Sequence, residues 1–291
     1  MKDKFGMANE QYRDSVFRDF FNEPVRLLSL CNALLDSDFE NADEIEINTL
    51  QGNFFSAIKN DISCKIGDQF LILIEHQSSV NNNMPFRCLS YVAELLNNLV
   101  IDKSRFYSRQ VVKFPAPKFF VFYDGDDSEP LQREMRLSDA FSGDGTTLEL
   151  VVKSFNINYG LNQPLIEKCS YLSEYSTLVG KIKQGCIAGL SRRQAIREAV
   201  NWCIENGIMA GYLSFKRNEV FTMLDWQWNL NDAKTAWKEE GREEGIEQGE
   251  RQRAEKIAVK MIKRGKSFAE IHEDTDLPLR RIYELAESIE A

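Results

Sequence analysis

The chain has 291 residues, of which 43% are hydrophobic and 11% aromatic, and its formal net charge at neutral pH is −9. This composition supports one main domain with a sizeable core and an appendage, whereas the acidic balance excludes a protein that coats nucleic acid along its whole surface. The six cysteines form no CxxC pair and no zinc-finger spacing, so we expect free, mostly buried thiols. The N-terminus lacks the apolar region of a signal peptide, and no apolar run reaches a membrane-spanning length. We therefore expect a cytoplasmic protein with no membrane partner.

Two short helices are predicted before the first strand. Apolar residues recur at helical spacing between residues 11 and 36, and Pro24 divides the pattern because proline does not fit a helix interior. A loop rich in Asp, Glu and Asn follows from Asp36 to Glu46.

A meander of three strands is predicted next, over Ile47 to Ile58, Ile62 to Ile66 and Phe70 to Ile74. The run of Phe, Leu and Ile in the third strand indicates burial on both faces, and the strand is expected to end at the polar residues that follow. Polar residues at the end of a buried strand are a common place for a functional site.

One long helix and two further strands complete the predicted core. The helix is expected from Met84 to about Tyr107, with Pro85 in its first turn, and the strands over Lys118 to Tyr123 and Thr147 to Tyr159. This order predicts an α/β or α+β core of residues 1 to 160 with helices on the faces of the sheet.

The rest of the chain is predicted to be helical. Residues 161 to 228 form a helical extension, residues 229 to 256 a charged Glu/Gly-rich linker helix, and residues 257 to 291 a small tail that resembles a helix-turn-helix unit. The linker is either a solvated helix or a self-association helix with glycines along one stripe. The near-neutral tail is either a packing and oligomerisation module or a DNA-binding one.

The candidate chemistry lies in the predicted hairpin. Asp61 opens one strand and Glu75 ends its neighbour, so both carboxylates are expected at one edge of the sheet. Two carboxylates there can share a hard divalent cation such as Mg²⁺. Gln77 lies two residues beyond Glu75 and is expected to point the same way. The alternative is that Asp61 ends a turn and Glu75 is a charge at a strand end.

Residues 10 to 160 resemble the PD-(D/E)XK nucleases, and more closely the Rpn family of recombination-promoting nucleases and transposases. The segments that carry the resemblance are RDSVFRDFF from Arg13, NDISCKI from Asn60, LIEHQSSVNNNMPFRCLSY from Leu73, KFFVFYDG from Lys118 and, loosely, the Glu/Gly-rich tail. The resemblance implies a restriction-endonuclease-like mixed sheet flanked by helices, followed by an all-helical C-terminal region.

The resemblance also assigns roles to residues. Asp61 and Glu75 match the two acidic metal ligands, although Asn60 stands where the motif has Pro. Gln77 stands in place of the catalytic Lys, and it offers neutral hydrogen bonds where Lys offers a charge. Asp14 resembles the acidic residue that this fold often adds to the metal site, with surface solvation as the alternative.

Neighbouring residues have two interpretations each. His76 alternates with Glu75 and Gln77, so it is expected on the opposite face of the sheet, as a packed histidine or as a general base. Arg87 and Tyr91 share one helix face, where they flank the scissile phosphate or support the strand end.

A basic segment follows the long helix. Between Lys103 and Lys118 the chain has five Lys or Arg residues, no acidic residue and interleaved aromatic residues. Its cations are expected either to follow DNA phosphates beside the metal site or only to maintain solubility; the candidates for DNA binding are Lys103, Arg105, Arg109 and Lys113.

These features together predict a DNA endonuclease that depends on Mg²⁺ or Mn²⁺ and hydrolyses phosphodiester bonds, with a role in recombination or in the processing of mobile-element or phage DNA. The alternative is a DNA-binding regulatory protein that keeps the fold and has lost activity, because the motif Lys is missing. A third hypothesis is an oligomeric scaffold that assembles as a homo-oligomer through its C-terminal helices.

Overall fold

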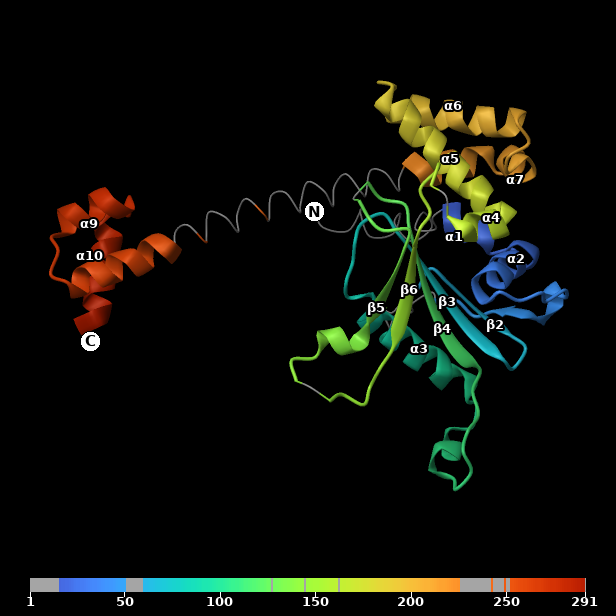
Figure 1. The fold of residues 1–291 in the computed structure, drawn as a ribbon, viewed down its shortest axis with the longest axis horizontal. Coiled ribbons are helices and arrows are strands. Elements are labelled where there is room, and N and C mark those ends of the chain that lie inside the picture. The colour runs from blue at the N-terminus through green and yellow to red at the C-terminus, as the bar shows by residue number, and fades with distance from the viewer. Residues whose placement is uncertain are drawn as a thin grey trace, which may run out of the picture. The chain divides into compact units, whose positions relative to one another are not determined.

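The structure is a computed structural model, and it describes residues 16–50, 60–126, 128–143, 145–161, 163–225, 242, 249 and 252–290. The chain divides into two compact units, Met1–Gln227 and Trp228–Ala291, and each unit is described by itself (Figure 1). The predicted core and the predicted helical extension therefore belong to one compact unit.

The first unit is built on a six-stranded mixed sheet. Its strands lie in the order β1-β2-β3-β4-β6-β5, with β3, β4 and β6 parallel to one another and β1, β2 and β5 antiparallel to their neighbours. The strands are β1 (Ile45–Ile47), β2 (Ile62–Ile66), β3 (Phe70–Gln77), β4 (Ala116–Tyr123), β5 (Gln132–Arg136) and β6 (Val151–Asn156). The prediction of a mixed sheet flanked by helices is confirmed.

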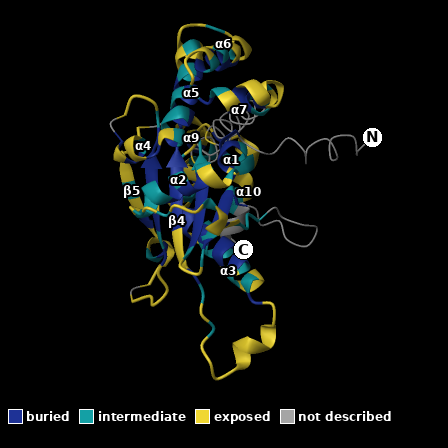
Figure 2. Cartoon of the chain, turned by 90° about the vertical axis from the view of Figure 1, so that its right-hand side faces the viewer, coloured by how far each residue is buried: buried dark blue, intermediate teal, exposed yellow. Residues whose placement is uncertain are grey.

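Helices cover both faces of this sheet. Helix α3 (Met84–Leu99) packs its buried Val92 and Leu95 against Leu71 and Leu73 of β3. The opposite face is covered by α1 (Val16–Phe21), α2 (Pro24–Leu35) and α5 (Ser170–Ile187). There the ring of Phe17 packs against that of Phe122 of β4, with 5.6 Å between the ring centroids. The central strands are therefore buried on both sides (Figure 2). Each fully buried Leu or Phe side chain contributes about 1.5–3 kcal/mol to this packing.

The remaining helices of the first unit follow the sheet in sequence. They are α4 (Pro164–Lys168), α6 (Arg192–Glu205), α7 (Ala210–Phe215) and a helical segment of residues 217–225. Short 3-10 helices occupy Ala42–Glu44, Lys103–Tyr107 and Leu137–Ala140. Pro24, Pro85 and Pro164 each lie in the first turn of a helix, where a missing backbone N–H costs no hydrogen bond.

Several predicted boundaries are wrong. Strand β3 continues through Gln77, whereas the sequence suggested an end at Ile74. The first strand ends at Ile47, and residues 48–50 lie outside it; residues 51–59 are not among the described residues. Helix α3 ends at Leu99 because Val100 adopts an extended conformation. The last strand is limited to β6, and the sequence interpretation missed β5.

The second unit contains three short helices in its described part: residues 252–263, α9 (Phe268–Thr275) and α10 (Leu279–Glu290). Ser267 and Glu270 form a capping box at the start of α9. A small core holds the helices together and contains Ala258, Ile271, Leu277 and Ile282. Most of residues 229 to 256, including Gly241 and Gly245, lie outside the described residues, so both the linker helix and self-association along its glycine stripe stay predictions.

The cysteines are free and mostly buried, as the sequence predicts. All six are free thiols; five are buried, and Cys186 is exposed. Among the helices that the structure describes, none combines the length and the apolar character that crossing a membrane requires.

Candidate active site

Asp61 and Glu75 lie beside each other where β2 begins and β3 nears its end. The antiparallel register pairs Ile62 with Ile74, so the residue before β2 meets the residue after Ile74. The backbone N–H of Asp61 donates to Oε1 of Glu75 at 3.1 Å. Glu75 is only 2% exposed, whereas Asp61 is half-buried. The hairpin thus brings the two predicted carboxylates together.

Helix α3 contributes a cation to this pair. Arg87 lies one turn into the helix, and its Nη2 donates to Oε2 of Glu75 at 2.9 Å. The hydroxyl of Tyr91 accepts from both Nε and Nη2 of Arg87, at 3.0 and 2.8 Å. The spacing of four residues places both side chains on one helix face, as predicted. The Arg87 side chain remains 36% exposed, and Nη1 donates to Sδ of Met84 at 3.4 Å.

Burial and like charge dominate the electrostatics of Glu75. Its pKa is raised from 4.5 to about 8, first because burial disfavours the carboxylate and then because the charge of Asp61 repels it. Arg87 and the N–H of Asp61 lower the pKa without compensating fully. The pKa of the Tyr91 hydroxyl is also raised, by burial and by Glu75. A buried carboxylate with a strongly shifted pKa and a charged neighbour is typical of functional sites.

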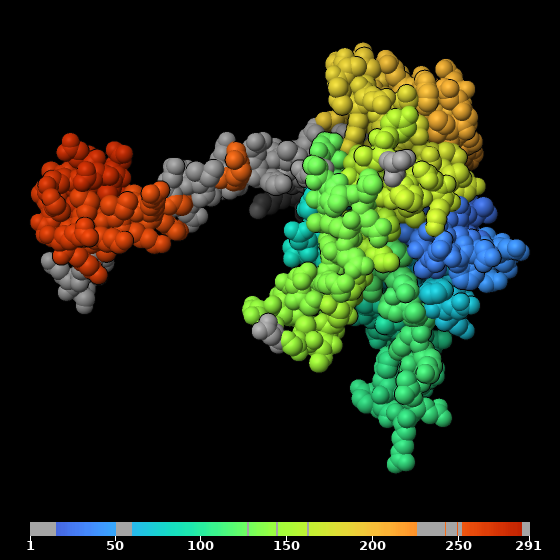
Figure 3. Space-filling view, in the orientation of Figure 1, coloured from blue at the N-terminus to red at the C-terminus, as the bar shows by residue number. Residues whose placement is uncertain are grey.

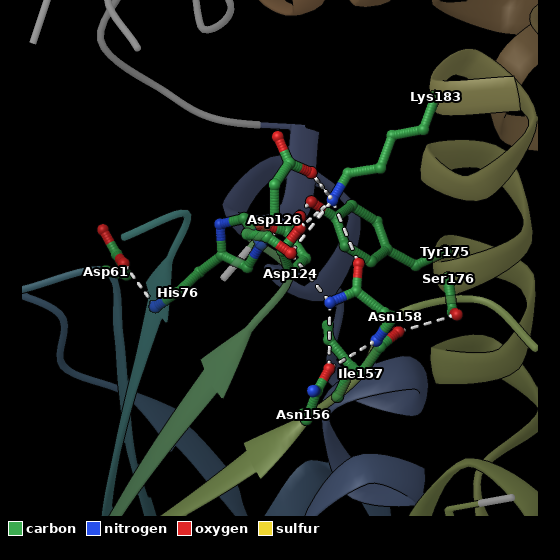
Figure 4. A network of polar contacts seen from close by, with 11 residues as sticks. Asp61, His76, Asp124, Asp126, Asn156, Ile157, Asn158, Tyr175, Ser176 and Lys183 are labelled. Carbon is green, nitrogen blue, oxygen red and sulfur yellow. Dashed lines mark hydrogen bonds and ion pairs between the residues drawn. The ribbon is translucent and has the colours of Figure 1, made fainter. Parts of the chain in front are cut away.

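His76 lies on the other face of the sheet, as its alternation with Glu75 predicts. Its ring stacks on that of Phe17 of α1, with 4.9 Å between the ring centroids. Its Nε2 contacts Oδ2 of Asp124 at 2.8 Å and the hydroxyl of Tyr175 at 3.2 Å (Figure 4). Burial alone would lower its pKa, but the charge and hydrogen bond of Asp124 outweigh burial and raise the pKa. The geometry matches the prediction of a packed, hydrogen-bonded histidine.

The donor set partly fits a divalent cation. The described residues contain no group of three or more His, Cys, Asp or Glu side chains with the proximity that metal binding needs. Asp61 and Glu75 supply two carboxylates, and Mg²⁺ commonly binds through one or two carboxylates while it keeps several waters. The repulsion that raises the pKa of Glu75 is the kind that a cation relieves. Asp14, the third predicted ligand, lies outside the described residues.

Gln77 ends β3 two residues beyond Glu75 and shares its face by strand alternation. It is half-buried, so its amide can be reached from solvent.

The basic segment lies at the other end of α3 from Arg87. Strand β4 starts beside Phe70, the residue of β3 farthest from Gln77, so the preceding segment projects from the opposite end of the sheet (Figures 1 and 3). Twelve helical residues from Arg87 to Leu99 correspond to about 18 Å. Lys103, Arg105, Arg109 and Lys113 are all exposed. The expectation that they lie beside the carboxylates is therefore wrong.

Sequence reasoning missed the polar residues that surround His76. Asp124 directly follows the strand predicted over Lys118 to Tyr123, and Tyr175 and Lys183 lie in the predicted helical extension, but nothing in the sequence placed them together. Lys183 of α5 reaches the loop after β4, where it donates to the carbonyls of Asp124 and Gly125. No local pattern marks residues that meet from such distant positions; the available signal was the placement of Asp124 at the end of a buried strand.

No family model matches the chain, and neither a curated protein nor a solved structure matches it.

Proposed function

We propose that the protein is a metal-dependent DNA endonuclease that hydrolyses phosphodiester bonds. The observation that carries the proposal is that Asp61 and Glu75 are neighbours: the backbone N–H of Asp61 donates to the Glu75 carboxylate, and burial together with the charge of Asp61 raises the pKa of Glu75. The sequence resemblance to nucleases supplies the substrate class. A role in recombination or in the processing of mobile DNA belongs to the same proposal.

Each residue has a role that its surroundings support. Asp61 and Glu75 would hold the cation, which when bound lowers the pKa of a coordinated water and neutralises charge on the phosphate. Arg87, held against Glu75 and Tyr91, presents a partly exposed guanidinium that can form hydrogen bonds to a phosphate oxygen. Gln77 can donate a neutral hydrogen bond but supplies no charge. In this proposal the positive charge that the motif Lys provides therefore comes from Arg87 and the cation.

Cleavage of supercoiled plasmid DNA with Mg²⁺ or Mn²⁺ tests the proposal. Wild type should nick or linearise the plasmid, and Asp61→Asn and Glu75→Gln should each lose more than about 100-fold in rate, the upper range for residues that only support a metal ligand. Asp68→Asn is the matched control, because Asp68 lies in the turn of the same hairpin with a 99% exposed side chain. Equal cleavage by all variants would refute the proposal.

The basic segment gives the proposal a geometric consequence. A separation of about 18 Å along α3 corresponds to about five base pairs of duplex DNA. Lys103 and Arg105 would then contact the phosphate backbone away from the scissile bond. Replacing each by Ala should weaken binding to all DNA sequences alike. The slope of the logarithm of the binding constant against the logarithm of the salt concentration should fall by about one for each lost phosphate contact.

A catalytically inactive DNA-binding protein is the second candidate. Arg87 already donates a hydrogen bond to Glu75, and Gln77 stands where the motif has Lys. This candidate predicts tight DNA binding without a divalent ion and no cleavage under any metal condition. Binding that requires the ion, together with cleavage, would exclude it.

A further inference from the structure

The backbone of His76 holds the carboxylate of Asp61. The His76 N–H donates to Oδ2 of Asp61 at 2.7 Å (Figure 4). The N–H of Asp61 in turn donates to Oε1 of Glu75 at 3.1 Å. Asp61 lies just before β2, outside the strand itself. Among the described residues, the end of β3 therefore supplies a donor that helps to set the direction of the Asp61 carboxylate.

The His76 side chain fixes that part of β3 from the opposite face. It is 4% exposed, and it is enclosed by the ring of Phe17, the carboxylate of Asp124 and the hydroxyl of Tyr175. A buried polar side chain with charged hydrogen bonds has few alternative conformations, since leaving its partners would strand buried polar groups. The His76 side chain is thus held by contacts from the loop after β4, from α1 and from α5.

Lys183 holds Asp124 in turn. Its ammonium donates to the carbonyls of Asp124 and Gly125, to Oδ1 of Asp126 at 2.9 Å and to Oδ1 of Asn158 at 3.0 Å. Gly125 lies so close to the chain after β3 that an added Cβ would be 2.2 Å from the carbonyl oxygen of Ser78. The loop after β4 is therefore fixed both to α5 and to the end of β3.

We infer that His76 and Asp124 are positioning residues for the metal site, and that Lys183 makes the site depend on α5. The path runs from the Lys183 ammonium through the Asp124 loop and the His76 ring to the His76 N–H, which holds the Asp61 carboxylate. This inference rests on the proposed function, in which Asp61 and Glu75 bind the cation. It also gives the predicted helical extension a role in the site.

Mn²⁺ affinity of the full chain, measured by isothermal titration calorimetry, gives the first test. Substitutions of residues that support a metal ligand commonly weaken metal binding by about 10- to 100-fold. We expect losses in this range for Asp124→Ala and Lys183→Met, and a smaller loss for Asp124→Asn, which keeps a hydrogen bond to His76. Lys181→Met is the matched control, because Lys181 of the same helix lies over the ring of Trp202 at 4.1 Å. Wild-type affinity in both Asp124→Ala and Lys183→Met would overturn the inference.

Amide hydrogen exchange in metal-free protein, measured by NMR, gives a second and independent test. Lys183→Met should accelerate exchange of the His76 and Asp61 amides at least about tenfold relative to the amides in the middle of β3, and Lys181→Met should not. Unchanged exchange at both amides would overturn the inference even if the variants bind Mn²⁺ weakly. If wild type binds no Mn²⁺, the proposed function fails, and the exchange result alone decides whether α5 controls the position of Asp61.

Discussion

Replacing Glu75 with Gln should remove a large pH dependence of stability in metal-free protein. The pKa of Glu75 is raised from 4.5 to about 8 in the folded chain, so the folded state keeps this proton over a range in which the unfolded state loses it. The stabilisation is fully present below pH 4.5 and is lost as the pH rises through about 8. At about 1.4 kcal/mol per pKa unit, the change amounts to roughly 4–5 kcal/mol. Gln has the same shape and stays neutral, so the variant lacks this dependence.

Urea unfolding in EDTA, followed by circular dichroism between pH 5 and pH 9, measures this effect. As the pH rises from 5 to 9, the free energy of unfolding of wild type should fall relative to that of Glu75→Gln. At a slope of about 3 kcal/mol per M of urea, the fall corresponds to a shift of the urea midpoint of about 1.5 M. Glu149→Gln is the control. Hydrogen bonds from Ser138 lower the pKa of Glu149, so its contribution is lost only as the pH falls below about 4.5. If the difference in free energy of unfolding between wild type and Glu75→Gln is the same at every pH, the reasoning is refuted.

Two packing predictions use thermal or urea unfolding as the measurement. Gly180→Ala should destabilise the protein by about 1–3 kcal/mol, because its Cβ would lie 2.2 Å from Cβ of Tyr159; Gly211→Ala, whose Cβ meets nothing within 4 Å, should be neutral or slightly stabilising. If Gly180→Ala and Gly211→Ala change the stability equally, the close approach of Gly180 to Tyr159 is contradicted. Tyr212→Phe should cost about 1.5–3 kcal/mol, because the hydroxyl donates to Oδ2 of Asp19 at 2.7 Å; no loss would mean that solvent replaces this hydrogen bond at no cost.

Local patterns predicted the hairpin and the faces of its residues correctly, although they misplaced several ends of strands and helices. The run from Phe70 to Ile74 marks a buried strand, and the short turn before it forces an antiparallel hairpin, so the meeting of Asp61 and Glu75 follows from the sequence. Strand alternation likewise separates His76 from Glu75. Both inferences depend only on residues that lie close together in the sequence.

Tertiary contacts determine the elements that the sequence did not reveal. Strand β5 reads QREMR and buries only Met135 fully, so it lacks the apolar alternation of a strand and exists because it pairs with β6. The end of α3 was missed because the basic residues after Leu99 are good helix formers. The contact of Lys183 with the loop after β4 joins residues about 58 positions apart, and no spacing rule predicts such a contact.

Anomalous diffraction from a crystal grown with Mn²⁺ tests the central claim most directly. The proposed function predicts one strong peak between the carboxylates of Asp61 and Glu75, and loss of that peak in Asp61→Asn. Mn²⁺ bound only elsewhere, or no peak while Arg87 keeps its hydrogen bond to Glu75, would contradict a metal-dependent site at this position.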